Sequence, residues 1–457
     1  MFRACAAVLM IATFAFPAAA GSRTPEADPL VRTMDRIAEA ALADSSAFAL
    51  LTELCDEVGP RLSGSANYEA AVAWAMRHLE AAGLSEVRRE PVMTPHWERG
   101  AESARLLSPH EAQLTVLGLG GSVGTSSGGL EADVLAVGDF EELEARADEA
   151  AGRIVLFDPP WEGYGRTVRY RTRGAIAAAR HGAVGCLIRS VSPARDATAH
   201  TGVMRYDEGD TIPRIPAAAL AVEDAARLHR QADRGLPVRV RLEMGARWHP
   251  DAASANVVAD LPGRHHPEKI VLAGAHLDSW DVGCCAQDDG AGCVIAMEAA
   301  ALLERLGLRP RRTIRVVLFA DEEMNQTGGR AYARDHADEL ADHVAALESD
   351  SGGYPPAGFT VRGDSLVIAR LTELAAPLAD LDAANVSEGW GGVDISFMAD
   401  AGVPLIGHRV HNDGYFDIHH SPSDTIDKVD PGDLQRNVAV VAALLWALAE
   451  SPSSLRH

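Results

Sequence analysis

The second half of the chain alternates between short apolar runs and stretches with helical periodicity. The apolar runs predict strands over Ala255–Leu261, Lys269–Ala275, Thr313–Ala320 and Val344–Glu348. The 3.6-residue repeats predict helices over Gly290–Leu306 and Gly328–His336. Such regular alternation is typical of an α/β fold with a mixed, largely parallel sheet flanked by helices.

The first half has a different pattern. Helical periodicity covers Val31–Leu54 and Tyr68–Leu84. Short β-rich runs separated by Gly and Pro turns then follow, at Gln113–Leu119, Ala132–Val137, Gly152–Phe157, Gly182–Ile188 and Pro237–Met244. This change predicts a β-rich domain, residues 106–246, inserted into a main domain formed by residues 46–105 and 247–457.

The N-terminus is typical of a secretory signal peptide. Arg3 is followed by the apolar stretch Ala4–Pro17 and by an A-x-A cleavage pattern at Ala18–Ala20. We therefore expect residues 1–20 to be removed, residues 21–45 to form a possible pro-segment, and the protein to be secreted or periplasmic. No later apolar run is long enough to span a bilayer.

Composition and charge narrow the class of function. With 457 residues, 47% hydrophobic and 23% charged, the chain is ordinary for a folded globular protein. Its formal net charge of -23 would repel phosphate backbones and anionic lipid. Nucleic-acid and membrane-surface functions are therefore not expected.

Residues that bind metal follow three of the predicted strands. The first strand end carries His276 and Asp278, the second Glu322 and Glu323, and the third Asp350. The pair Asp288–Asp289 precedes a helix, and His419 and His420 come late in the chain. In doubly wound sheets, ligands bind beyond the carboxyl ends of the strands. These side chains are therefore expected in one pocket.

Each of these residues also has an ordinary structural interpretation. A lone His276 could be a buried structural histidine, Asp288–Asp289 could cap the helix that follows, and Asp424 could cap the helix after Pro431 or form a local turn. Together they favour a metallohydrolase, because acids and imidazoles rarely meet at one sheet edge by accident. Such a mixture suits Zn²⁺, with Mn²⁺ or Co²⁺ also possible.

The same residues carry a resemblance to a known family. The segments His276–Gly283, Asp288–Gly290, Glu322–Glu323, Glu348–Asp350 and His420–Thr425 resemble the co-catalytic zinc aminopeptidase/carboxypeptidase family. Leu54–Ser65, Ile188–Ser190 and His200–Gly202 resemble its plasma glutamate carboxypeptidase branch. The resemblance covers nearly the whole mature chain. It implies the zinc exopeptidase fold, with residues 106–246 as a lid related to protease-associated domains.

The resemblance also implies roles for single residues. It makes His276 and Asp350 ligands of one zinc, Glu323 and His420 ligands of a second, and Asp288 the bridge between them. Glu322 would be the general base and Asp278 would orient His276, and the Asp288–Asp289 peptide bond would be cis. The implied activity is hydrolysis of dipeptides or short peptides with a free N-terminus, with two Zn²⁺ per chain. A homodimer is possible by analogy.

Two departures from the family pattern stand out. Cys284–Cys285 occupies part of a loop where relatives carry other residues. The two cysteines could be zinc ligands, or they could form a packed or disulfide-linked pair. Trp390 precedes the segment where relatives place a Tyr that stabilises the oxyanion, so that donor stays unassigned. The alternatives are a glutaminyl cyclase-like enzyme with a single zinc and a non-catalytic binding ectodomain of the same fold. Metal content would distinguish the three.

Overall fold

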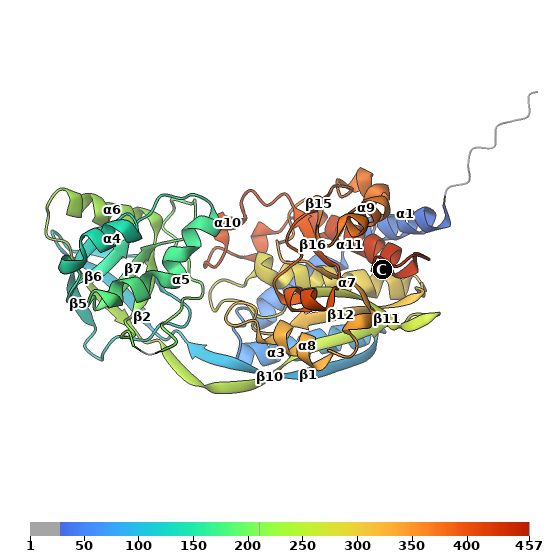
Figure 1. The fold of residues 1–457 in the computed structure, drawn as a ribbon, viewed down its shortest axis with the longest axis horizontal. Coiled ribbons are helices and arrows are strands. Elements are labelled where there is room, and N and C mark those ends of the chain that lie inside the picture. The colour runs from blue at the N-terminus through green and yellow to red at the C-terminus, as the bar shows by residue number, and fades with distance from the viewer. Residues whose placement is uncertain (1–27, 210, 457) are drawn as a thin grey trace, which may run out of the picture.

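The computed structural model describes residues 28–209 and 211–456, so the expected signal peptide lies outside the described residues. Two domains lie side by side, joined by the long strands β1 (Ser85–Glu98) and β10 (Arg247–Leu261) (Figure 1). Each domain is built on an eight-stranded sheet. No helix within residues 28–209 and 211–456 is both long and apolar enough to cross a bilayer.

The sheet of the main domain has the order β1-β10-β12-β11-β13-β16-β14-β15. Its central strands β12, β11, β13 and β16 run parallel, whereas β1, β10 and β14 pair antiparallel with their neighbours, apart from the parallel β14–β15 pair. The remaining strands are β11 (His266–His276), β12 (Arg312–Phe319), β13 (His343–Glu348), β14 (Pro356–Arg362), β15 (Val386–Glu388) and β16 (Leu405–Val410). The predicted α/β class with a mixed, largely parallel sheet is confirmed.

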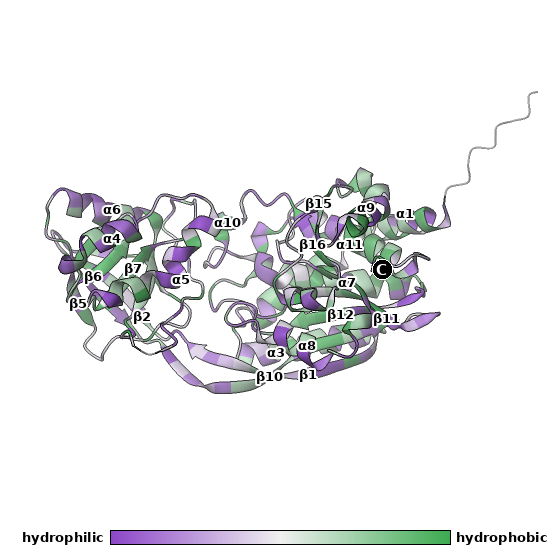
Figure 2. Ribbon diagram, viewed as in Figure 1, coloured by the Kyte–Doolittle hydropathy of each residue, from purple (hydrophilic) through white to green (hydrophobic). Residues whose placement is uncertain are grey.

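Helices cover both faces of this sheet. The larger apolar core joins one face to α1 (Pro29–Leu42), α2 (Ser46–Glu53), α3 (Ala66–Ala81), α7 (Ala291–Arg305), α9 (Ser365–Ala375) and α11 (Pro431–Glu450). A smaller core joins the other face to α8 (Thr327–Asp335) and the 3₁₀ segment η6 (Asp394–Ala401). Figure 2 shows apolar residues gathered in the central strands and inner helix faces, and a paler, more polar β1–β10 ribbon between the domains.

The second sheet has the order β3-β2-β9-β5-β6-β7-β8-β4, with β5 to β8 parallel. Its strands are β2 (Glu102–Ser108), β3 (Ala112–Leu114), β4 (Val116–Gly118), β5 (Leu130–Val137), β6 (Ile154–Phe157), β7 (Gly185–Arg189), β8 (Ala217–Leu220) and β9 (Arg239–Met244). Its helices are α4 (Phe140–Ala145), α5 (Tyr164–Arg180) and α6 (Val222–Asp233). We call residues 99–246 the inserted domain. Strand β2 belongs to this sheet and crosses the expected boundary at residue 106.

Three parts of the main domain bear on the sequence predictions. The helix expected over Val31–Leu54 is broken, because the Asp44 carboxylate accepts the backbone N–H of Ser45 and Ser46 and starts a new helix there. Within residues 21–45, the possible pro-segment, α1 buries apolar side chains against α11 as part of the main core, and removal of this segment stays a prediction. Strand β1 was not predicted, because it is an edge strand that pairs on one side only and keeps many polar residues, so its sequence lacks an apolar run.

Candidate metal centre

Three parallel strands deliver the first set of candidate ligands. His276 is the last residue of β11, Glu322 and Glu323 follow β12, and Asp350 follows β13. Strands β12 and β13 pair in parallel with β11 on its two sides. Their carboxyl ends therefore meet at one edge of the sheet, as the positions of the acids predicted.

Asp288 lies between two imidazoles that come from different parts of the chain. His276 Nε2 is 3.3 Å from Asp288 Oδ1 and 3.6 Å from Asp350 Oδ1. His420 Nε2 is 3.3 Å from Asp288 Oδ2 and 3.0 Å from Glu323 Oε2. Each oxygen of Asp288 therefore faces its own imidazole and its own second carboxylate. This is the arrangement that a bridging carboxylate between two cations requires.

The hydrogen bond of His276 Nδ1 and the unpaired oxygen of Glu323 fit a metal site. His276 Nδ1 is 3.0 Å from the main-chain carbonyl of Asp278. Since a carbonyl can only accept, Nδ1 carries a proton, and Nε2 is the ring nitrogen that faces Asp288 and Asp350. Glu323 Oε1 is buried and has no hydrogen-bond partner among the described residues. The donor set thus fits cations of the zinc type.

Burial and the imidazoles together set the charges of the site. Burial raises the pKa of Glu322, Glu323 and Asp350 above the ordinary carboxyl range. Burial also acts to raise the pKa of Asp288, but hydrogen bonds from His276 and His420 outweigh it and hold that pKa well below the ordinary value. Several buried acids in one pocket call for positive charge beyond these imidazoles.

Asp278 holds the two consecutive acids through their backbone. Its carboxylate accepts the N–H of Glu322 at 3.0 Å and that of Glu323 at 3.4 Å, and a hydroxyl hydrogen bond from Ser63. Its Oδ1 is 3.7 Å from His276 Nδ1, farther than its own main-chain oxygen. Asp278 therefore orients His276 through its carbonyl, while the carboxylate positions Glu322 and Glu323.

Two supporting residues were missed or misassigned from the sequence. The Trp280 indole Nε1 donates to Glu323 Oε2 at 2.6 Å, a contact that no local pattern indicates. Asp424 does not cap α11, whose N-terminus is capped by Asp430. It accepts the backbone N–H of Gln287 and Asp288 at 2.9 and 3.1 Å and so fixes the bridging residue. The Asp288–Asp289 peptide bond is cis, as the resemblance implied.

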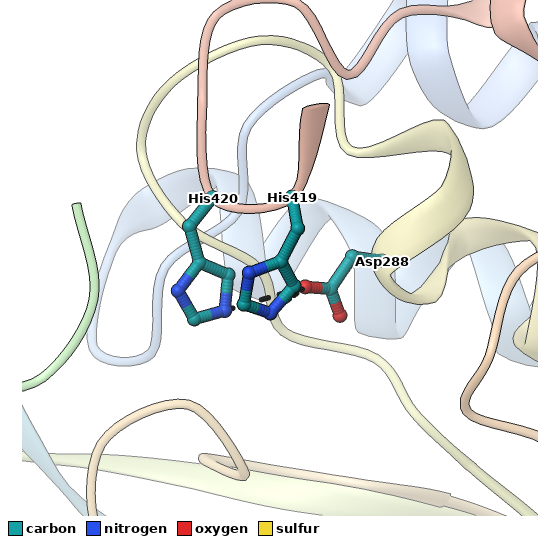
Figure 3. A group of neighbouring side chains, drawn as sticks. All are labelled: Asp288, His419 and His420. Atoms are coloured by element: carbon teal, nitrogen blue, oxygen red, sulfur yellow. Dashed lines mark ion pairs between the residues drawn. The ribbon is translucent and has the colours of Figure 1, made fainter. Parts of the chain in front are cut away.

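A second histidine, His419, also reaches the bridging carboxylate. Its Nε2 is 3.5 Å from Asp288 Oδ2, and its ring stacks on His420 with 3.5 Å between ring centroids (Figure 3). Both imidazoles were candidates from the sequence, but the family resemblance implied a ligand role for His420 alone. Burial lowers the pKa of His419 well below the ordinary value, so its imidazole is neutral and able to bind a cation.

The inserted domain completes the pocket. Thr201 donates its backbone N–H to the His420 carbonyl at 2.8 Å, and His200 Nδ1 is 2.7 Å from the His419 carbonyl. The cavity is about 300 Å³. Its lining combines both domains: Tyr164, Arg171, Val203, Asp288, Glu322, Glu323, Gln326, Asp350, Val393, Tyr415, Phe416, His419 and His420.

Cys284, Cys285 and Trp390 are not among the described residues that form the candidate metal centre. The thiols of Cys284 and Cys285 are both free, and the groups of described side chains close enough to hold an ion contain no cysteine. Cys285 Sγ donates to the Val282 carbonyl at 3.2 Å, and Cys284 forms its thiol contact with Cys55. Trp390 is 58% exposed and does not line the pocket.

Known proteins resemble this chain over most of its length. The model of Peptidase family M28 matches residues 256–445. Carboxypeptidase Q of Homo sapiens is 42% identical over 415 residues, which cover 90% of this chain and 87% of the relative. Carboxypeptidase Q of Mus musculus is 42% identical over 402 residues, 88% of this chain and 85% of the relative.

Solved structures give the same result for the fold. A Peptidase M28 precursor from Shewanella amazonensis SB2B is 39% identical and superposes with a TM-score of 0.90, covering 94% of this chain and 98% of that one. BSAP, a zinc aminopeptidase from Bacillus subtilis, shares the fold at 20% identity with a TM-score of 0.66, covering 90% of this chain and 96% of that one. The chain therefore belongs to peptidase family M28 and is a metallo-exopeptidase of that family.

Proposed function

We propose that this chain is an exported exopeptidase with two zinc ions that hydrolyses dipeptides or short peptides with a free N-terminus. The observation that carries the proposal is Asp288, whose two oxygens face separate sets of imidazole and carboxylate. His276, Asp288 and Asp350 would hold one ion. Asp288, Glu323 and His420 would hold the other, with His419 beside them. When bound, the pair of cations would supply Lewis acidity at the scissile carbonyl and lower the pKa of water.

The side chains of the pocket divide the remaining work. Glu322 lines the cavity, and its backbone N–H donates to the Asp278 carboxylate, which fixes its position. Its own carboxylate can take a proton from water at Oε and pass it to the leaving nitrogen. Tyr164 and Tyr415 line the same cavity, and burial raises the pKa of both phenols. Each therefore stays a hydrogen-bond donor that can stabilise the developing oxyanion.

The acidic lining also accounts for the free N-terminus. Glu322 and Asp350 present carboxylate groups to the cavity and favour a substrate ammonium over an acylated amine. Export rests on the pattern of residues 1–20.

Glu322→Gln tests the base. We expect this variant to keep two zinc ions per chain and to lose at least about 1,000-fold in kcat on a dipeptide. Elemental analysis counts the metal on the same sample that is assayed. A chelator should abolish the wild-type activity, and an N-acetylated dipeptide should not be cleaved. Full turnover by the variant, or one zinc per chain in the wild type, contradicts the proposal.

A further inference from the structure

Among the described residues that line the catalytic cavity, Arg171 is the one arginine or lysine. It belongs to α5 of the inserted domain, whereas the acids of the cavity belong to the main domain. Its side chain is 4% exposed. A long cationic side chain is rarely buried to this extent without a paired anion.

The guanidinium of Arg171 lacks such an anion. Its Nη2 donates to the Tyr164 hydroxyl at 2.9 Å, and its Nη1 makes longer contacts, 3.4 Å to the Thr201 carbonyl and 3.3 Å to His420 Nδ1. Its Nε is buried without a partner, and none of the partners of the guanidinium among the described residues is a carboxylate. Leaving a buried charge without a counter-ion is costly, so this cation is held ready for an anion that the protein itself does not supply.

The fold makes room for Arg171 at this place. Gly202 lies against the guanidinium, with φ of +126°, and a Cβ built on it would lie 2.3 Å from Arg171 Nη1. The neighbouring Thr201 is held in place by the hydrogen bond from its backbone N–H to the His420 carbonyl. The inserted domain therefore places this positive charge beside the candidate ligands.

The contact of Arg171 with His420 is long, at 3.3 Å, and depends on the tautomer of the imidazole. A guanidinium can only donate, so in this contact Nδ1 must accept and the imidazole proton must be on Nε2. An imidazole that binds a cation through Nε2 carries its proton on Nδ1 instead. Arg171 Nη1 then loses His420 as an acceptor and is available to another oxygen.

We propose that Arg171 binds the C-terminal carboxylate of the substrate and so restricts the enzyme to dipeptides. The proposal rests on the proposed function of the same site. A planar guanidinium matches a carboxylate with two parallel hydrogen bonds. The charge also offsets the repulsion between a substrate carboxylate and the acids Asp288, Glu322, Glu323 and Asp350.

The position of Arg171 in the cavity limits the length of the peptide that can reach it with its C-terminal carboxylate. One residue extends a peptide by at most about 3.6 Å, so the carboxylate of a dipeptide lies within that distance of the scissile carbonyl carbon. Arg171 Nη1 is 3.3 Å from the ring of His420, whose other nitrogen is 3.0 Å from Glu323. One imidazole ring therefore separates the guanidinium from Glu323. Each further residue would carry the carboxylate up to about 3.6 Å past it, within a cavity of about 300 Å³.

The test compares a dipeptide, its C-terminal amide and the matching tripeptide as substrates. For Arg171→Ala we expect kcat/KM on the free dipeptide to fall about 100-fold, the loss typical of a charged hydrogen-bonded pair, and kcat/KM on the amide to change less than about threefold. Arg171→Lys should recover part of the loss, because it keeps the charge without the planar fork. Arg169→Ala is the matched control, since Arg169 lies on the same helix, is exposed and stacks on Tyr170.

Binding gives a second readout that does not depend on turnover. Calorimetric titration of the dipeptide into Glu322→Gln should give a Kd about 100-fold lower than into Glu322→Gln/Arg171→Ala. Equal losses on acid and amide, or no loss on the acid, overturn the assignment of Arg171. Turnover retained by Glu322→Gln would instead contradict the proposed function, and the acid-to-amide ratio would still report on Arg171. If Arg171→Ala does not fold, Arg171→Gln is put through the same measurements.

Discussion

Trp280→Phe is the variant that tests most directly how this chain holds the ion assigned to Glu323 and His420. Trp280 is 1% exposed, and its indole Nε1 donates to Glu323 Oε2 at 2.6 Å. The other oxygen of Glu323 has no hydrogen-bond partner in the described chain. The indole is therefore the neutral donor that orients this carboxylate toward His420. Phenylalanine keeps an aromatic ring at the position and removes the donor.

The magnitude follows from that single bond. A hydrogen bond to a charged group contributes about 1.5–3 kcal/mol, and 1.4 kcal/mol corresponds to a factor of ten in affinity. The affinity for one zinc ion should therefore fall about 10- to 150-fold. The ion assigned to His276 and Asp350 makes no use of this bond and should keep its affinity.

Competition with a chromophoric chelator measures both affinities on one sample. Trp97→Phe is the matched control, because Trp97 is buried in the same small apolar cluster and donates its indole N–H to the Ser122 carbonyl instead. Both variants should lose some thermal stability, since each replaces a buried indole with a smaller ring. The reasoning is refuted if Trp280→Phe keeps both zinc affinities within twofold of the wild type, or if Trp97→Phe weakens zinc equally.

Two further variants test other parts of the structure. Asp278→Asn should lower kcat about 10- to 100-fold, measured on a dipeptide, because an amide cannot accept both backbone N–H groups of the Glu322–Glu323 segment. His343 accepts the Tyr332 hydroxyl and contacts a carbonyl, and burial lowers its pKa to about 4 from 6.5. The unfolded chain thus binds this proton first, so the stability from neutral His343 is present above pH 6.5 and is lost, up to about 3 kcal/mol, as pH falls toward 4. Denaturant unfolding at pH 7.5 and pH 5 should show a smaller difference for His343→Gln than for the wild type, and an unchanged difference would contradict this.

Local chemistry made much of the centre predictable from the sequence. His276, Glu322–Glu323 and Asp350 each follow an apolar run that predicts a buried strand, and parallel strands deliver their carboxyl ends to one edge. The family resemblance added the pairing of ligands and the role of Glu322. These inferences need only the order of residues within a few positions of each strand end.

The residues that support the centre could not be predicted in the same way. Trp280 bonds a carboxylate 43 positions away, and Arg171 contacts a ring 249 positions away across two domains. Asp424 has the sequence context of a helix cap, yet its partners are the backbone N–H groups of Gln287 and Asp288. No periodicity records such pairs.

The sequence by itself therefore determined the sheet, its chemistry-bearing edge and the types of ligand, because strand periodicity and strand-end chemistry are local properties. Only the tertiary structure decided how the ligands are held and closed off. Strands β1 and β10 join the inserted domain to the main domain (Figure 1). Thr201 and Arg171 of the inserted domain contact the His419–His420 loop. Contacts of this kind depend on how two separately formed cores pack, and that packing is fixed by shape and burial over the whole molecule.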